Sequence, residues 1–122
     1  MAFNVQIATA ALGNVNGAGP FPLWYLPDEG GAISVLAAHA VSDGAGTSVG
    51  LKLISITDAG TPSSASGTIG SFAGTVTYAA NARFACTLAT PAVNDGQWIG
   101  VEQTSGTVAA NTRIVLSYVM GK

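Results

Sequence analysis

The sequence predicts one all-β domain, folded as an antiparallel β-sandwich or a jelly-roll-like barrel, and three observations support this prediction. Several short segments alternate apolar and polar residues with a period of two, which is the pattern of a half-buried strand. Glycine, which occurs 16 times, and proline divide the chain into short pieces, and the predicted strands are separated by turns at a spacing of roughly 8 to 12 residues. No segment of helical periodicity is available to cover a sheet, so the strands must pack on one another. A length of 122 residues fits a single domain.

The two clearest strand patterns occupy residues 32–42 and 49–57. The first is rich in alanine, but its β-branched residues and the glycine-containing breakers at both ends favour a strand over a helix. One of its faces is expected to present Ile33, Val35, Ala37, His39 and Val41, and the other Ser34, Leu36, Ala38 and Ala40. The second strand has apolar residues on both faces, so we expect both faces to contact other parts of the molecule. These apolar residues are Leu51, Leu53, Ile54 and Ile56.

Further strands are predicted in the second half of the chain, at residues 68–72, 75–78, 83–88, 97–103 and 112–120. Two of them begin after the same motif, Ala-Ala-Asn-x-Arg, which ends at Arg83 and at Arg113. We therefore expect two equivalent hairpin turns at the same end of the fold. The triplet Asn-Asp-Gly at residues 94–96 is a turn signal. The glycine-rich segment 44–50 resembles a phosphate-binding loop, but it lacks the following helix and the Lys-Ser/Thr ending, so it is predicted to be a hairpin connection.

The first 31 residues do not follow the strand pattern. They are predicted to form an extended N-terminal arm, with residues 32–122 as the antiparallel β domain. This segment combines glycine and proline with the large apolar side chains of Phe21, Trp24 and Tyr25. Such side chains must be removed from water, either on a surface of this chain or on that of a neighbour.

Charge is scarce. Only 8% of the residues are charged, with 4 Lys+Arg against 6 Asp+Glu and a net charge of −2, whereas about a quarter of a usual domain is charged. Nucleic-acid binding is therefore not expected, because phosphate neutralisation supplies most of that affinity. Disorder and membrane insertion are not expected either, since the chain is apolar with low net charge and no apolar run reaches about 18 residues. The N-terminus lacks the pattern of a signal peptide, and the single cysteine, Cys86, fits a reducing compartment.

No catalytic site, metal site or cofactor is predicted, and the protein is not expected to be an enzyme. His39 is the only histidine and lies in an apolar strand without a partner at fixed spacing, so we expect a partly buried structural side chain. Cys86 lies between Phe84 and Leu88 on one strand face and is expected to be a small buried hydrophobe. No second cysteine or histidine offers a zinc spacing. Aspartates in turns leave a calcium site open as an alternative.

The scarcity of charge predicts a protein whose surface is covered in an assembly. The chain has few charges for solubility and few edge lysines to prevent strand pairing. Aromatic residues dominate buried interfaces. The candidate interface anchors are Phe21, Trp24, Tyr25 and Trp98. A platform for sugar stacking is the alternative role of the aromatic residues Trp24, Tyr25, Tyr78, Trp98 and Tyr118.

Four segments also carry a resemblance to a known family: GGAISVLAAHAVS (30–42), LKL (51–53), QWIGV (97–101) and SYVMGK (117–122). With these segments the chain resembles small virion proteins encoded among the head genes of tailed bacteriophages. The resemblance implies a β-rich decoration or cement protein that forms a homo-oligomer, for example a trimer. Its partner would be the major capsid protein and its location the virion, after assembly in the host cytoplasm. The alternative is a module associated with a phage fibre or neck, or a carbohydrate-binding β-sandwich.

Overall fold

The structure is a computed structural model that describes residues 5–13, 20–27, 30–41, 46–57, 67–78, 83–107 and 112–121. Within these ranges the chain forms strands and no helix, so the described part contains no helix that could cross a membrane. The strands are β1 (Gln6–Gly13), β2 (Phe21–Tyr25), β3 (Ile33–Val41), β4 (Gly46–Ile56), β5 (Gly67–Tyr78), β6 (Arg83–Leu88), β7 (Ala92–Val93), β8 (Trp98–Thr107) and β9 (Thr112–Met120). The predicted all-β class is confirmed.

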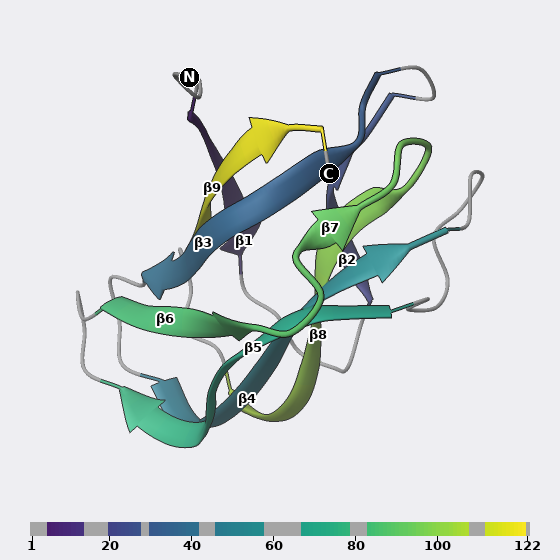
Figure 1. Cartoon of the computed structure of the whole chain (residues 1–122). Coiled ribbons are helices and arrows are strands. Elements are labelled where there is room, and N and C mark those ends of the chain that lie inside the picture. Colours follow the sequence, from purple (N-terminus) through teal and green to yellow (C-terminus); the bar gives the residue numbers. More distant parts are fainter. Residues whose placement is uncertain are drawn as a thin grey trace.

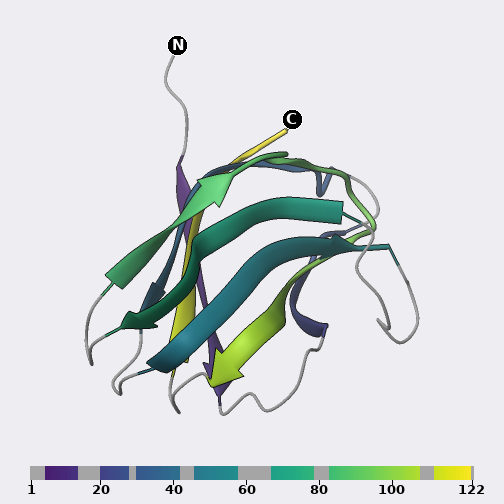
Figure 2. The ribbon, with the colours of Figure 1, turned by 90° about the horizontal axis from the view of Figure 1, so that it is seen from below.

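All strand pairs are antiparallel and follow one path, in the order β1-β9-β3-β6-β5-β4-β8-β2, with β7 added beside β3. The sheet curls until its two end strands, β1 and β2, approach each other, so that it nearly closes into a barrel. Figures 1 and 2 show β1 beside β9 on one side of this curl and β4 beside β5 on another. No strand pairing joins β1 to β2 in the described part of the chain.

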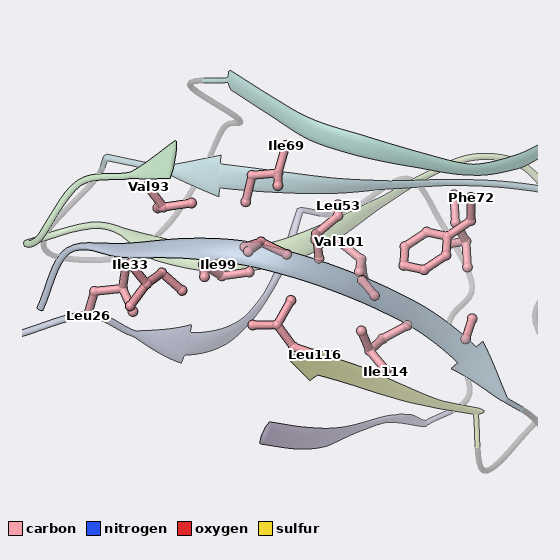
Figure 3. Packing of buried hydrophobic residues seen from close by; sticks show 14 residues of the cluster. Leu26, Ile33, Leu53, Ile69, Phe72, Val93, Ile99, Val101, Ile114 and Leu116 are labelled. Atoms are coloured by element: carbon pink, nitrogen blue, oxygen red, sulfur yellow. The ribbon is translucent and has the colours of Figure 1, made fainter. Parts of the chain in front are cut away.

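One apolar core fills the inside of the curled sheet (Figure 3). Its buried members come mainly from β3, β4, β5, β7, β8 and β9, and partly buried residues of β1, β2 and β6 pack against it. The largest side chains that are almost completely buried include Phe72, Leu53, Ile99, Ile114 and Leu116. Each of these side chains contributes about 1.5–3 kcal/mol when it is removed from water. The core therefore supplies the force that curls the sheet, because only a curled sheet lets the inner faces of distant strands meet.

A β-bulge in β3 changes which residues face the core, and this corrects the predicted alternation. The pairing with β9 shifts between Val35 and Ala37, so that Leu36 is an extra residue. Val35 is buried before the bulge, whereas Ala38 and Ala40 are buried after it. The prediction that one unbroken alternation runs from Ile33 to Val41 was therefore wrong. The bulge turns Ala37, His39 and Val41 to the outer side of the sheet.

The prediction that both faces of the second strand are covered is confirmed. Leu51 and Leu53 of β4 belong to the core cluster. Ile54 and Ile56 are also buried, with 1% and 0% of their surface exposed, but they lie outside that cluster. β4 is a central strand between β5 and β8, so it has no open edge.

Other predicted elements differ in detail. The strands predicted at 83–88 and 112–120 match β6 and β9. Those predicted at 68–72 and 75–78 are one strand, β5, and the strand predicted at 97–103 begins one residue later and extends to Thr107 as β8. Segment 44–50 does not form a hairpin connection, because β6 and β5 lie between β3 and β4 in the sheet.

The extended arm predicted for residues 1–31 is not confirmed. Within this segment, β1 pairs with β9 and β2 pairs with β8, so its described residues include the two end strands of the sheet. The sequence signal is weak here because β1 consists mainly of alanine and threonine, and β2 contains Pro22 and an irregularity between Pro22 and Trp24. The strand pairing leaves the choice between a sandwich and a jelly-roll-like barrel open, since the sheet is continuous but not closed.

The repeated motif does start two strands at the same end of the fold. Arg83 of β6 and Arg113 of β9 are both in register with Val41, the last residue of β3, which lies between them. Only the first motif belongs to a hairpin, because β5 pairs with β6 but β8 does not pair with β9. The second motif instead lies between β8 and β9, which stand near opposite ends of the strand order.

Candidate functional site

The candidate site is the seam, which we define as the gap between the end strands β1 and β2. A pocket of about 210 Å³ lies in this seam. Ala8, Leu116 and Tyr118 line it from the β1 and β9 side, whereas Trp24 and Tyr25 line it from β2. The lining is mainly apolar, so the pocket suits a hydrophobic side chain or a small apolar molecule.

The four predicted interface anchors lie close to this seam, on the paired strands β2 and β8. Phe21 and Trp24 are half-buried and pack against the core cluster, and Trp24 also lines the pocket. Tyr25 is 42% exposed and lies directly opposite Trp98 across the strand pair. The structure thus brings the anchors together, but two of them also serve the core.

Tyr25 and Trp98 form an aromatic pair. Their ring centroids are 5.2 Å apart and their planes are inclined by 54°. Tilted pairs of this kind contribute about 0.5–1.5 kcal/mol beyond the area they bury. The indole Nε1 of Trp98 is buried and finds no hydrogen-bond partner among the described residues.

The local sequence explains how β2 reaches this position. At Gly100 of β8, an added Cβ atom would lie 2.4 Å from the carbonyl oxygen of Phe21, so only glycine lets β2 pass this closely. After β2, the Leu26 N–H donates to the carbonyl oxygen of Gln97 over 2.8 Å, and the Gly96 N–H donates to the carbonyl oxygen of Leu26 over 3.0 Å. Gly96 has a φ of +72°, as the predicted turn at 94–96 requires.

Several exposed apolar residues near the seam were not predicted from the sequence. Ile7 of β1 is 72% exposed, and Val5, which precedes β1, is 53% exposed. Met120, at the end of β9, is 58% exposed. Leu36, in the bulge of β3, is 49% exposed. The composition predicts such residues in general, but the individual positions depend on the strand register and on the bulge.

His39 and Cys86 do not form a catalytic pair. His39 is in register with Ala85, which is exposed, so it lies on the outer side of the sheet. Cys86 is the next residue along β6, and it packs against the core on the inner side. Burial raises the pKa of the Cys86 thiol from 9.0 to about 11, because the thiolate would lose hydration, so the thiol is neutral at physiological pH.

Metal-binding groups do not gather in the part of the chain that the structure describes, where no cluster of three or more His, Cys, Asp or Glu side chains occurs. Of the turn aspartates behind the calcium alternative, Asp95 is exposed, and Asp43 and Asp58 lie outside the described residues, as does the side chain of Tyr78. Tyr118 lines the seam pocket. Comparison of the chain with protein-family models, with curated proteins and with solved structures finds no match.

The variant Gly100→Ala tests whether close passage of β2 over β8 maintains the seam. The added methyl group meets backbone atoms of Phe21 and Pro22 at 2.4–3.1 Å, so β2 must move. We expect a loss of about 1–3 kcal/mol in the free energy of unfolding in urea and a change in tryptophan fluorescence. The control is Gly67→Ala, whose methyl group meets only the Ser55 side chain at 3.1 Å. Equal stability of the two variants would contradict this role of Gly100.

Proposed function

We propose that this chain is a non-enzymatic structural protein that associates with copies of itself and covers a repetitive protein surface. The observation that carries the proposal is β1, an uncharged end strand that pairs on one side with β9 and on the other side with no described strand, and that has an exposed isoleucine, Ile7. An open strand edge presents unpaired N–H and C=O groups that can pair with another chain.

The two end strands of the sheet differ in how far they resist such pairing. β2 contains Pro22 and a register shift, and both features oppose the addition of a further strand. β1 has the sequence QIATAALG, with no charge and no proline, and its only irregularity lies between Ala11 and Gly13. Monomeric proteins usually protect such an edge with charged side chains or proline. The contrast supports pairing through β1.

Exposed apolar side chains support the same proposal. Val5, Ile7 and Met120 are each more than half exposed, and all three belong to β1, β9 or the residue preceding β1. Val5 and Ile7 would be flanked by the added strand if a second copy paired with β1, whereas Met120 lies on β9, on the other side of β1. Burial of a side chain such as Ile7 contributes about 1.5–3 kcal/mol, which corresponds to a tenfold or larger change in affinity.

The resemblance to small head proteins of tailed bacteriophages identifies the surface that we propose is covered. In this proposal the chain is a decoration or cement protein, its partner is a major capsid protein, and its location is the virion. Scarce charge supports this proposal, since 8% charged residues is low for a protein that stays a free monomer. Within the N-terminal segment, β1 would then make the contact with a neighbouring copy.

Carbohydrate binding, or a place in a phage fibre or neck, is the alternative proposal. It draws on the Tyr25–Trp98 pair and on the 42% exposure of Tyr25. A sugar ring stacks on a flat aromatic face, however, and the two rings are inclined by 54°, so they do not form one platform. The open edge of β1 therefore gives assembly the stronger support.

Light scattering coupled to size-exclusion chromatography tests self-association, with the variant Ile7→Lys as the probe. We expect the wild-type chain to form an oligomer. The dissociation constant of the oligomer should be at least tenfold higher for the variant, because a lysine charge at β1 opposes strand addition. Ile7 is 72% exposed, so the substitution leaves the core intact. The control is Thr87→Lys, which adds the same charge at an exposed position of β6.

A wild-type chain that stays monomeric at high concentration, or an oligomer that both variants weaken equally, would overturn the proposal. Deletion of residues 1–27 does not serve as a test, because it would remove both end strands of the sheet.

A further inference from the structure

We infer that the outer side of β6, β3 and β9 carries a binding site for carboxylate groups of a protein partner, formed by Arg83 and Arg113. We call this surface the arginine face and define it by the row Arg83, Val41 and Arg113 and by the adjacent row Ala85, His39 and Val115. The inference goes beyond the proposed function, since it concerns a different surface from the edge of β1 and holds for any protein partner.

The strand register places the two arginines on the same side of the sheet. Both are paired with Val41, and residues directly opposite each other in an antiparallel sheet point to the same face. One strand lies between them, so their backbones are separated by two strand spacings, or about 10 Å. Two long side chains that start at this separation can contact a pair of carboxylates or converge on one.

Burial shows that this is the outer side. Ile114, the residue after Arg113, is completely buried, and Ala40, the residue before Val41, is likewise completely buried. Neighbouring residues of a strand point to opposite faces, so the side chains of Arg113 and Val41 point away from the core. Arg83 and Arg113 are both exposed.

The surroundings contain no compensating negative charge among the described residues. The only described carboxylates are Asp95, in the turn at 94–96, and Glu102, which lies on β8 directly opposite Lys52. The second row of the arginine face contains small or apolar side chains and His39. Two of the four Lys and Arg residues of the chain thus lie on either side of Val41, and no described carboxylate belongs to either row of the arginine face.

This pattern favours a protein carboxylate over nucleic acid or free phosphate. Guanidinium groups bind carboxylates through paired, charge-assisted hydrogen bonds, and arginine is enriched where proteins meet. Nucleic acid requires many more phosphate contacts than two arginines can provide, and the net charge of −2 repels a long polyanion. Val41, Ala85 and Val115 add an apolar surface of the kind that protein partners cover.

Nuclear magnetic resonance of the intact chain tests the inference with the peptide hexaglutamate as the probe. We expect the peptide to shift the side-chain Nε–Hε signals of Arg83 and Arg113 and the amide signal of Val41 in a saturable way. The matched peptide hexaglutamine should leave them unchanged. Raising the ionic strength from about 0.01 to about 1 M, which shortens the Debye length from about 30 to about 3 Å, should abolish the shifts.

Charge-removing variants locate the site. The double variant Arg83→Gln with Arg113→Gln should bind hexaglutamate about tenfold or more weakly, since two surface ion pairs are lost. The control Lys52→Gln removes one cation on β4, away from this face, and should leave the affinity unchanged. Amide spectra of both variants report whether the fold is retained.

Three results would overturn the inference: no shifts with hexaglutamate, equal loss of affinity in the Lys52→Gln control, or tighter binding of inorganic phosphate than of hexaglutamate. These results are independent of the light-scattering experiment, so failure of self-association through β1 and failure of the arginine face are distinguished.

Discussion

The fold depends on the curling of one antiparallel sheet around a single apolar core. Each interior strand along the curl exchanges backbone hydrogen bonds with two neighbours, whereas β1 and β2, at the ends, each have one. Core side chains such as Phe72, Leu53 and Ile114 bring the distant parts of the sheet together, but they cannot supply hydrogen bonds between β1 and β2. The seam results from this lack of strand pairing between β1 and β2. No strand pairing closes it among the described residues, and a pocket of about 210 Å³ lies within it.

This constraint relates the seam to the scarcity of charge. A sheet that closed completely would need no protection of its edges, and a sheet with open edges usually protects them with charges, proline or bulges. Here β2 is protected by Pro22 and its register shift, whereas β1 is left uncharged. The few cations that the chain has are also unevenly placed, because Arg83 and Arg113 flank Val41 on the outer side of the sheet. One open edge and one charged face are what a component with more than one neighbour would need.

The sequence allowed much of the fold to be predicted where alternation is uninterrupted. β6 and β9 follow an unbroken period of two, and their bounds were predicted to the residue. In β3 the extra residue Leu36 reverses the inward face, and no property of that leucine distinguishes it from its neighbours before the pairing with β9 is known. β1 could not be recognised because its isoleucine, Ile7, is exposed, whereas the half-buried positions are the alanines Ala8 and Ala10.

The candidate site was partly predictable for a similar reason. Aromatic size pointed to Trp24, Tyr25 and Trp98, and these residues do lie at or beside the seam. The other side of the pocket, with Ala8 and Tyr118, depends on which strands end the sheet, and the sequence does not contain that information locally. The arginine face could be predicted only in part. The repeated motif marks Arg83 and Arg113, but only the register shows that Val41 separates them.

The central claim is that the edge of β1 is open in the single chain and becomes covered when copies associate. Amide hydrogen exchange of residues 6–11, measured at low and at high protein concentration, tests this most directly. We expect the β1 amides not bonded to β9 to exchange rapidly in dilute protein and to be protected at concentrations where the oligomer forms. Strong protection of these amides at every concentration would show that β1 already has a partner within the chain, which would rule out assembly through this edge.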